Sequence, residues 1–381
     1  MKLKLFNLAI LLLLISSIIN AQETLNKSMN LDGIERDYIV YVPEKYTADS
    51  PVPLMFNFHG FTMSANDQMT FCDMRSIADT AGFILIYPQG TLFFGAPHWN
   101  VGSWTSASTA DDIGFTNAMI DTILSEYNID LDRVYSSGFS NGGYFSFELA
   151  CKLSDRIAAI GTVGGTMSNE TFDACDPEHP IPVVTIHGTI DGTVSYSGGA
   201  PFNSKSQDEV IDFWSDFNDT EVVAIESELN DLDTNDGSTV THFDYQMGEA
   251  CSSVQHYRVD GGDHDWPGSW GNMDIDASEV IWNFVSQYDI NGLISCGISS
   301  NNDLGSFADE IEVYPNPSDG VFSVQIESNE PKTYTVFSTI GESLKSGLIG
   351  IGNQTIDISD FPSGLYHVKI DNSVMKVMKS N

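Results

Sequence analysis

Short apolar segments alternate with longer amphipathic segments from residue 22 to about residue 296, and this alternation constrains the fold more than any other feature. Several apolar segments are continuous, as is typical of strands buried on both faces of a parallel sheet. We expect strands at residues 37–42, 54–59, 83–87, 133–136, 157–163, 183–187 and 254–259. We expect helices at residues 111–127, 142–153, 207–217 and 276–287. Strands alternating with helices predict an α/β domain with a doubly wound sheet over residues 22–296.

The C-terminal part of the chain follows a different pattern. Residues 297–308 are polar and rich in Gly, Ser and Asn, which predicts a linker. Short alternating segments then occur at residues 321–326, 333–337, 355–357 and 365–370, separated by Gly, Asn, Pro and Asp. This pattern predicts a small all-β sandwich domain over residues 309–381.

The N-terminus has the features of a secretory signal peptide. Lys2 and Lys4 precede an apolar run from Leu5 to Ile19, and Ala21 supplies a small residue at a cleavage point. We therefore expect residues 1–21 to be removed on export; the alternative is an uncleaved anchor helix. No second apolar stretch of spanning length occurs, so we expect no membrane span in the mature protein.

The charge balance excludes some partners. The chain has 16 basic and 53 acidic residues, for a net charge of −37 at pH 7. So negative a surface repels phosphate backbones and anionic lipid headgroups. We therefore expect neither nucleic acid nor anionic membranes as partners.

Five cysteines follow the predicted signal peptide: Cys72, Cys151, Cys175, Cys251 and Cys296. Export permits disulfides, and an odd number leaves at least one thiol unpaired. Cys151 and Cys175 flank one predicted strand and its loop, so they are the most plausible pair. Five buried thiols are the alternative. No Cys-x-x-Cys spacing occurs, so the sequence gives no support for a structural zinc site.

Residues 138–142 read Gly-Phe-Ser-Asn-Gly and lie between a predicted strand and a predicted helix. A Gly-x-Ser-x-Gly segment in this context is typical of a sharp strand-to-helix turn that exposes a nucleophilic serine. Side chains two positions either side of the serine would collide in such a turn, which explains both glycines. The pattern therefore predicts Ser140 as a nucleophile; a purely structural glycine-rich turn is the alternative.

A serine hydroxyl needs a neighbouring base, and in this kind of domain the base follows the acid along the chain. His264 lies in a glycine-rich loop after the strand at 254–259, and we expect it to be the base. The other histidines between Ser140 and the predicted linker are in less suitable positions: His179, His187, His242 and His256. A histidine in an ordinary surface loop is the alternative for His264.

Asp191 follows the predicted strand at 183–187 and is the expected acid. Its carboxylate would accept the Nδ1 proton of His264 and fix the tautomer of the ring. The alternative is that Asp191 only caps a turn with Gly192.

Two backbone N–H groups would have to stabilise a developing oxyanion. Asn141 directly follows the nucleophile and supplies the first candidate. Phe61 follows the strand at 54–59 and supplies the second, since Gly60 allows a close approach of the backbone. An ordinary turn at the end of that strand is the alternative.

Aromatic residues in the loops that follow strands are candidates for contact with a sugar or a phenolic group. Trp104 and Trp266 are the candidate substrate-binding residues, with Trp99, Phe93 and Phe94 nearby in the same kind of loop. Plain loop packing explains them equally well. The acidic stretch 231–237 resembles a calcium loop, but its glycine comes one place late, so we predict no metal site.

Six motifs in fixed order resemble one family of extracellular esterases. They are residues 59–62 (His-Gly-Phe-Thr), 87–90 (Tyr-Pro-Gln-Gly), 111–115 (Asp-Asp-Ile-Gly-Phe), 138–143 (Gly-Phe-Ser-Asn-Gly-Gly), 187–191 (His-Gly-Thr-Ile-Asp) and 263–268 (Asp-His-Asp-Trp-Pro-Gly). Together they are similar to the polyhydroxybutyrate depolymerases, feruloyl esterases and acetylxylan esterases, which have the α/β-hydrolase fold. The resemblance implies a serine esterase without metal or organic cofactor, and its triad coincides with Ser140, Asp191 and His264.

The resemblance leaves the substrate open between a polyester, an acylated or feruloylated polysaccharide and a small ester. The chain also departs from the family pattern. Asp263 and Asp265 flank the histidine where the family has Gly and Thr, respectively. The expected partner of Cys251 is absent from the family position, which implies that Cys251 is free.

The tail resembles the C-terminal sorting domain of the type IX secretion system of the Bacteroidota. The matching segments are residues 313–317 (Val-Tyr-Pro-Asn-Pro), 364–366 (Gly-Leu-Tyr) and 376–379 (Lys-Val-Met-Lys). This implies that the secretion machinery is a partner and that the protein is secreted or attached to the cell surface. A carbohydrate-binding module is the alternative for this domain.

Two other functions remain open at this point. A serine peptidase of related fold would share the triad, but it usually carries a propeller or a large lid domain, which this chain lacks. A catalytically inactive binding protein would keep the fold without needing the triad.

Overall fold

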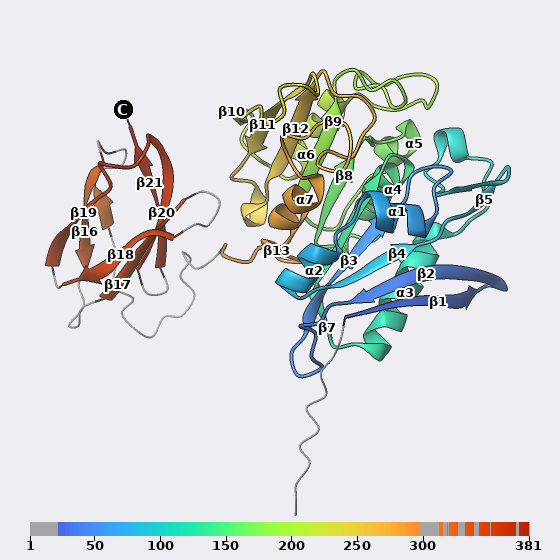
Figure 1. Ribbon diagram of the computed structural model, residues 1–381, viewed down its shortest axis with the longest axis horizontal. Coiled ribbons are helices and arrows are strands. Elements are labelled where there is room, and N and C mark those ends of the chain that lie inside the picture. Colours follow the sequence, from blue (N-terminus) through green and yellow to red (C-terminus); the bar gives the residue numbers. More distant parts are fainter. Residues whose placement is uncertain are drawn as a thin grey trace, which may run out of the picture. The chain divides into compact units, whose positions relative to one another are not determined.

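The computed structural model describes residues 22–296 and, with gaps, residues 312–380 (Figure 1). Contacts divide the chain into two compact units, Met1–Ile294 and Ser295–Asn381, which are described separately. The predicted signal peptide (1–21) and linker (297–308) lie outside the described residues, as do residues 315–317 of the tail motif. The domain limits given by the sequence therefore stay predictions.

The first unit is built on one ten-stranded sheet. Its strand order is β1-β2-β4-β3-β7-β8-β9-β12-β11-β10. The strands are β1 (Glu23–Leu31), β2 (Ile34–Val42), β3 (Val52–Phe58), β4 (Ile84–Pro88), β7 (Ile129–Phe139), β8 (Ala159–Val163), β9 (Val183–Gly188), β10 (Ile225–Glu228), β11 (Thr239–Tyr245) and β12 (Val254–Asp260). The run from β4 to β12 is parallel, whereas both edges of the sheet are antiparallel.

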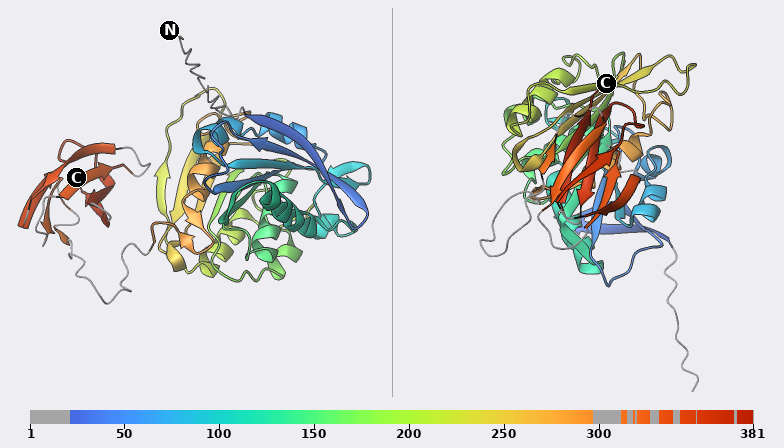
Figure 2. Two further views of the ribbon diagram at one scale, coloured as in Figure 1. Left: turned by 90° about the horizontal axis from the view of Figure 1, so that it is seen from below. Right: turned by 90° about the vertical axis from the view of Figure 1, so that its left-hand side faces the viewer.

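Helices cover both faces of this sheet (Figure 2). The helices are α1 (Ala65–Phe71), α2 (Arg75–Ala81), α3 (Asp112–Glu126), α4 (Asn141–Lys152), α5 (Asn169–Asp173), α6 (Gln207–Phe217) and α7 (Ala277–Val285). Alternate residues of a strand point to opposite faces, so β2 sends Tyr38 and Val40 to the core with α3, α4 and α6. It sends Ile39 and Tyr41 to the core with α1, α2 and α7. Both faces are buried, which accounts for the continuous apolar runs in the sequence.

The predicted α/β class is confirmed, and all seven strands and four helices predicted for this unit are present. The sheet differs from the prediction at its edges. Strands β1, β10 and β11 are absent from the sequence-based prediction because β1 and β10 are largely exposed and β11 mixes polar and apolar residues that are mostly half-buried. Two small hairpins also went unpredicted: β5 (Thr91–Phe93) with β6 (Ala96–His98), and β13 (Tyr288–Asp289) with β14 (Gly292–Leu293).

The second unit is a small antiparallel β structure, as predicted. Strands β15 (Glu312–Tyr314), β16 (Val321–Ile326) and β19 (Gly352–Asp357) form one sheet. Strands β17 (Lys332–Phe337), β18 (Ser343–Ile349), β20 (Gly364–Ile370) and β21 (Ser373–Lys379) form the other. One apolar core takes residues from both sheets, for example Phe322 from the first and Val368 from the second, so the unit is a sandwich with its own core.

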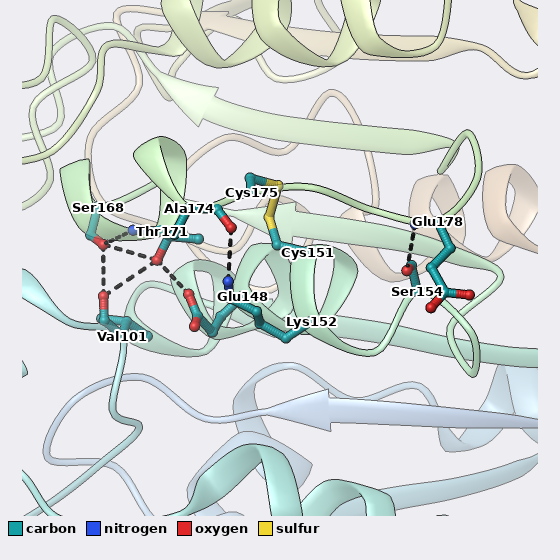
Figure 3. Close-up of a disulfide and its surroundings, with 10 residues drawn as sticks. All are labelled: Val101, Glu148, Cys151, Lys152, Ser154, Ser168, Thr171, Ala174, Cys175 and Glu178. Atoms are coloured by element: carbon teal, nitrogen blue, oxygen red, sulfur yellow. Dashed lines mark hydrogen bonds between the residues drawn. A yellow bond between two sulfur atoms is a disulfide. The ribbon is translucent and has the colours of Figure 1, made fainter.

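A disulfide joins Cys151, in the last turn of α4, to Cys175, just after α5 (Figure 3). The predicted pairing is therefore present. Cys251 and Cys296 are also disulfide-bonded, which corrects the expectation that Cys251 is free. Cys72 is a buried thiol. Within the described part of the chain, no helix is long and apolar enough to cross a membrane.

Candidate active site

Ser140 lies at the turn between β7 and α4, at the carboxyl end of the central parallel strands. Its backbone has φ 54° and ψ −117°, a conformation that non-glycine residues rarely adopt. The turn is fixed on both sides, because Ser140 N donates to Val163 O at 2.8 Å and Tyr144 N donates to Ser140 O at 3.0 Å. A strained serine held by its neighbours at the end of a strand fits the predicted nucleophile turn.

The glycines of the turn are required by close packing. A Cβ atom on Gly138 would overlap the backbone of Gly142, and one on Gly142 would overlap the carbonyl of Phe58 at the end of β3. The first turn of α4 therefore packs directly against the neighbouring strand. Both glycines of the Gly-x-Ser-x-Gly pattern serve the turn in the way the sequence suggested.

The predicted acid and base are in direct contact. His264 Nδ1 donates to Asp191 Oδ2 at 2.7 Å, although 73 residues separate them in the chain. Asp191 lies in the loop after β9 and His264 in the loop after β12, and these two strands are neighbours in the sheet. This contact leaves Nε2 as the imidazole nitrogen that is open to a proton from another group.

His264 and Ser140 pack against the same short turn after β8. A Cβ atom on Gly164 would lie 3.2 Å from His264 Nδ1, and one on Gly165 would lie 2.8 Å from Ser140 O. The ring of Phe139, next to the serine, lies 4.7 Å from the imidazole ring between centroids. The structure thus brings residues 140, 191 and 264 together at the carboxyl ends of the parallel strands.

Asp191 has further partners that the sequence did not indicate. Its Oδ1 accepts the N–H groups of Thr193 at 2.8 Å and Val194 at 2.7 Å, so it caps the turn as well as contacting His264. His187, at the end of β9, has its Nε2 3.2 Å from Asp191 Oδ2 and 2.8 Å from Val194 O. Gln207 Nε2 donates to Nδ1 of His187 at 2.7 Å, which makes His187 Nε2 the donor.

These contacts hold the Asp191 carboxylate in its charged form. Burial alone would raise the pKa of Asp191, but hydrogen bonds from His187 and His264 outweigh burial and lower the pKa well below its usual range. A permanently ionised carboxylate is what the histidine requires, because it stabilises the imidazolium that forms when the ring takes a proton.

The two aspartates that flank His264 are engaged elsewhere. Asp263 Oδ1 accepts the N–H of Gly192 at 2.9 Å and so ties the histidine loop to the acid loop. Asp265 Oδ2 accepts the N–H of Asn272 at 3.3 Å, and burial raises the pKa of Asp265 to about 6. Both carboxylates thus accept backbone hydrogen bonds in the loops around His264.

The candidate oxyanion donors lie on either side of the serine. A Cβ atom on Gly60 would lie 3.4 Å from Ser140 Cβ, so the turn after β3 borders the nucleophile. Thr62 N donates to Pro97 O and Met63 N donates to Gly60 O, whereas the N–H of Phe61 has no partner among the described residues. Asn141 is the first residue of α4, where backbone N–H groups lack acceptors within the helix.

The aromatic candidates divide into buried and accessible side chains. Trp266 is 1% exposed and donates its indole N–H to Ser278 Oγ at 3.1 Å. Trp99 is 0% exposed. Their burial does not fit the prediction that Trp266 contacts substrate, nor a stacking role for Trp99, because neither ring face reaches solvent.

Trp104 is half-buried and packs edge-to-face on Phe61, with 5.4 Å between ring centroids. The ring of Phe202 lies 5.2 Å from that of Trp104 between centroids. Phe61 itself is 38% exposed. These three rings, hereafter the aromatic cluster, lie next to the turn that borders Ser140.

No group of three or more His, Cys, Asp or Glu side chains suited to a metal ion occurs among the residues described. In the acidic stretch 231–237, Asp236 Oδ1 accepts from Ser238 N at 2.8 Å, and its Oδ2 accepts from Met273 N at 2.9 Å. Asp233 Oδ1 likewise accepts from Asn235 N at 3.1 Å. These oxygens hold the loop together through hydrogen bonds.

Comparison with known proteins gives two family matches. Residues 36–178 match the family described as esterase PHB depolymerase, and residues 312–380 match the family described as secretion system C-terminal sorting domain. The sheet order and the strand-to-helix turn define the first unit as an α/β hydrolase. Within that class, the first unit is similar to the esterase PHB depolymerase family, and the second unit is similar to the C-terminal sorting domains of a secretion system.

Two curated relatives illustrate the likeness. A bifunctional acetylxylan esterase/xylanase, XynS20E of Neocallimastix patriciarum, is 27% identical over 274 residues, or 72% of this chain and 36% of the relative. Feruloyl esterase B of Piromyces equi is 34% identical over 166 residues, or 43% of this chain and 31% of the relative. The matches thus span about a third of the length of these two relatives.

Solved structures with a similar chain course include two esterases. An acetyl xylan esterase from Aspergillus awamori has a TM-score of 0.48 at 16% identity, covering 66% of this chain and 94% of that one. A ferulic acid esterase from Anaeromyces mucronatus has a TM-score of 0.48 at 14% identity, covering 70% of this chain and 90% of that one.

The sorting domain marks the protein as secreted or attached to the cell surface.

Proposed function

We propose that this protein is a secreted serine esterase that hydrolyses carboxylic esters through an acyl-serine intermediate. The observation that carries the proposal is the 2.7 Å contact between His264 Nδ1 and Asp191 Oδ2. It lies at the carboxyl ends of the parallel strands, as does the strained Ser140. Asp191 is the orienting acid, His264 the base and Ser140 the nucleophile.

Each step of the proposed hydrolysis uses groups at the carboxyl ends of the parallel strands. Ser140 Oγ attacks the ester carbonyl while its proton passes to His264 Nε2, and the backbone N–H groups of Phe61 and Asn141 bind the resulting oxyanion. The imidazolium then protonates the leaving alcohol, and the acyl group stays on the serine. Water, activated by the same Nε2, cleaves the acyl-serine and releases the carboxylic acid. No metal or organic cofactor takes part in this scheme.

For the substrate we favour an acyl group on a polysaccharide, such as a feruloyl or acetyl ester of xylan. Two relatives carry acetylxylan esterase and feruloyl esterase in their names. The aromatic cluster beside the serine offers ring faces to a phenolic or sugar group. A polyester and a small soluble ester are the other outcomes of a substrate panel.

We also propose the route by which the protein reaches its substrate. Residues 1–21 are a signal peptide removed on export, 22–296 form the catalytic domain, 297–308 are a linker, and 309–381 address the protein to the type IX secretion machinery. The match of residues 312–380 to a secretion sorting domain supports the last of these assignments over a carbohydrate-binding module.

The decisive experiment replaces the nucleophile. Ser140→Ala should lower kcat for p-nitrophenyl acetate by at least about 10⁴-fold, because the remaining groups supply binding and oxyanion stabilisation without an acyl acceptor. Ser137→Ala is a matched control, since the hydroxyl of this buried serine of β7 contacts only structural groups, Phe56 O at 3.1 Å and Met74 Sδ at 3.9 Å. Hydrolysis by Ser140→Ala at the rate of the control would refute the assignment.

The native protein should react with a fluorophosphonate at Ser140. Mass spectrometry of the labelled peptide would detect the reaction. Hydrolysis of feruloylated or acetylated xylan, but not of polyester film, would support the favoured substrate class. Cleavage of peptide p-nitroanilides with equal efficiency would instead indicate a serine peptidase. If the protein hydrolysed no ester and formed no covalent bond with the phosphonate, it would be an inactive binding protein.

A further inference from the structure

Trp99 lies between the two segments that supply the oxyanion donors. It directly follows strand β6 and is completely buried. One segment is the turn after β3, which carries His59 and Phe61. The other is the start of α4, which carries Asn141. Trp99 hydrogen-bonds to both segments through different groups.

The backbone of Trp99 pairs with the side chain of Asn141. Trp99 N donates to Asn141 Oδ1 at 2.7 Å, and Asn141 Nδ2 donates to Trp99 O at 3.1 Å. The two bonds engage the amide end of Asn141 on both sides, and the residue is 1% exposed. The side chain is thus held away from the nucleophile, and the N–H of the same residue keeps a fixed direction at the helix terminus.

The indole of Trp99 holds the other segment. Trp99 Nε1 donates to His59 O at 2.9 Å, which fixes the peptide between His59 and Gly60. The imidazole of His59 is fixed as well, because its Nε2 accepts from Gly90 N at 2.9 Å. Burial lowers the pKa of His59 to about 4, so the ring is neutral and able to accept this bond.

Aromatic packing and a buried ion pair keep Trp99 itself in place. Its ring stacks on Phe145 of α4 at 5.2 Å and lies edge-on to Phe58 of β3 at 5.0 Å, both between centroids. The next residue, Asn100, donates its N–H to Asp112 Oδ2 at 2.8 Å. Asp112 in turn forms a buried ion pair with Arg36 at 2.6 Å.

We propose that Trp99 is a positioning residue for the oxyanion hole, which sets the distance and direction of the Phe61 and Asn141 N–H groups by bridging their two segments. The inference rests on the proposed esterase function and adds to it a residue that never touches the substrate. Oxyanion donors act only when aimed at the charge that develops in the transition state. A small displacement of either donor should therefore affect kcat more than KM.

The test removes one hydrogen bond while keeping an aromatic ring. Trp99→Phe deletes the indole N–H that reaches His59 O, and we expect kcat for p-nitrophenyl acetate to fall about tenfold with KM unchanged within about twofold. Phosphonylation of Ser140 by a fluorophosphonate should slow by a similar factor, because that reaction also places an oxygen in the oxyanion hole.

Trp214→Phe is the matched control. Trp214 is likewise 0% exposed and stacks on Phe147 of the same helix α4, at 6.3 Å between centroids. Its Nε1 has no hydrogen-bond partner among the described residues. This variant should lose stability through packing and keep both kcat and the phosphonylation rate.

Asn141→Ala provides a second arm that does not depend on the folding of Trp99→Phe. It deletes both bonds to the Trp99 backbone and should also lower kcat and the phosphonylation rate. The combined variant should lose less than the product of the two single effects, since both changes loosen one bridge.

Three results would overturn the proposal. The first is a kcat for Trp99→Phe within twofold of the native enzyme. The second is a raised KM with an unchanged phosphonylation rate, which would assign Trp99 to substrate binding. The third is a native kcat for the Asn141→Ala enzyme, which decides the question if Trp99→Phe does not fold. Hydrolysis by Ser140→Ala at the rate of the Ser137→Ala control would instead refute the esterase mechanism, so the two failures are distinguishable.

Discussion

The two carboxylate oxygens of Asp191 have different partners: one caps a turn and the other contacts histidines. Oδ1 caps the turn through the N–H groups of Thr193 and Val194, while Oδ2 accepts from His264 and lies 3.2 Å from His187 Nε2. The turn-capping interpretation of this residue is confirmed, and its role as the acid stays a prediction. The sequence disfavoured His187 as the base, and its contact with Asp191 helps to hold this carboxylate in place.

The role of Asp191 can be tested by an isosteric change. Asp191→Asn should lower kcat about 10⁴-fold with little change in KM, because an amide favours the wrong tautomer of His264 and does not stabilise the imidazolium. Steady-state kinetics on p-nitrophenyl acetate measures the effect. Asp263→Asn is the control, since the side chain only ties Gly192 and its amide oxygen still accepts that N–H. Equal effects of the two changes would contradict the assignment.

At the scale of single elements, burial decided which strands and helices could be predicted. Strands β3, β4, β8 and β9 are buried on both faces and appear in the sequence as apolar runs. The edge strand β1 alternates between exposed and half-buried residues of mostly polar character, so no apolar run marks it. Tertiary pairing with β2 makes it a strand.

Helix α4 connects Ser140, the proposed nucleophile, to the disulfide. It begins directly after Ser140 and contains Cys151 in its last turn, where the disulfide fixes it to the segment after α5. Thr171 of α5 also donates to Glu148 of α4 at 2.6 Å, and Lys152 Nζ donates to Ala174 O at 2.7 Å (Figure 3). The far end of the helix is therefore tied down independently of the active site.

Removal of this disulfide should destabilise the enzyme without changing its chemistry. The bridge closes a loop of sequence separation 24. The Cys151→Ser/Cys175→Ser variant should lose about 3 kcal/mol of unfolding free energy, since the unfolded chain regains the entropy of that loop. Urea unfolding measures the loss. At a temperature where the variant stays folded, kcat should remain within about twofold of the native value; a large loss of kcat would show that the bridge positions Ser140.

At the scale of the whole molecule, each unit has its own apolar core. A unit with a complete core keeps its structure when another is removed. The net charge of −37 is also a property of the whole chain, and a charge so far from zero favours solubility.

Deletion of residues 297–381 tests this independence together with the proposed domain limits. The shortened enzyme should hydrolyse p-nitrophenyl acetate with a kcat within about twofold of the full chain, because all proposed catalytic residues lie before residue 296. In a host with a type IX secretion system, it should be retained inside the cell envelope, as shown by immunoblotting of cell and medium fractions. Normal export of the shortened chain would refute the sorting role of the tail.

The sequence by itself determined the features that depend on residues close together in the chain. The Gly-x-Ser-x-Gly turn is one of them, since its glycines are required by backbone contacts within five residues and with the adjacent strand. The paired buried runs of the sheet are another, because burial on both faces requires apolar side chains. The roles of Ser140, Asp191 and His264 were predicted from motif order, and they stay predictions until the variants are measured.

Only the tertiary structure decided which distant groups meet. The pairing of β9 with β12 brings the loops of Asp191 and His264 together, and the β5–β6 hairpin inserts Trp99 between two segments that start from different strands. Burial of Trp99 and Trp266 was likewise decided by packing, because an aromatic residue in a loop fits an exposed site as well as a core. Sheet register and loop packing depend on the whole chain at once, so no local pattern encodes them.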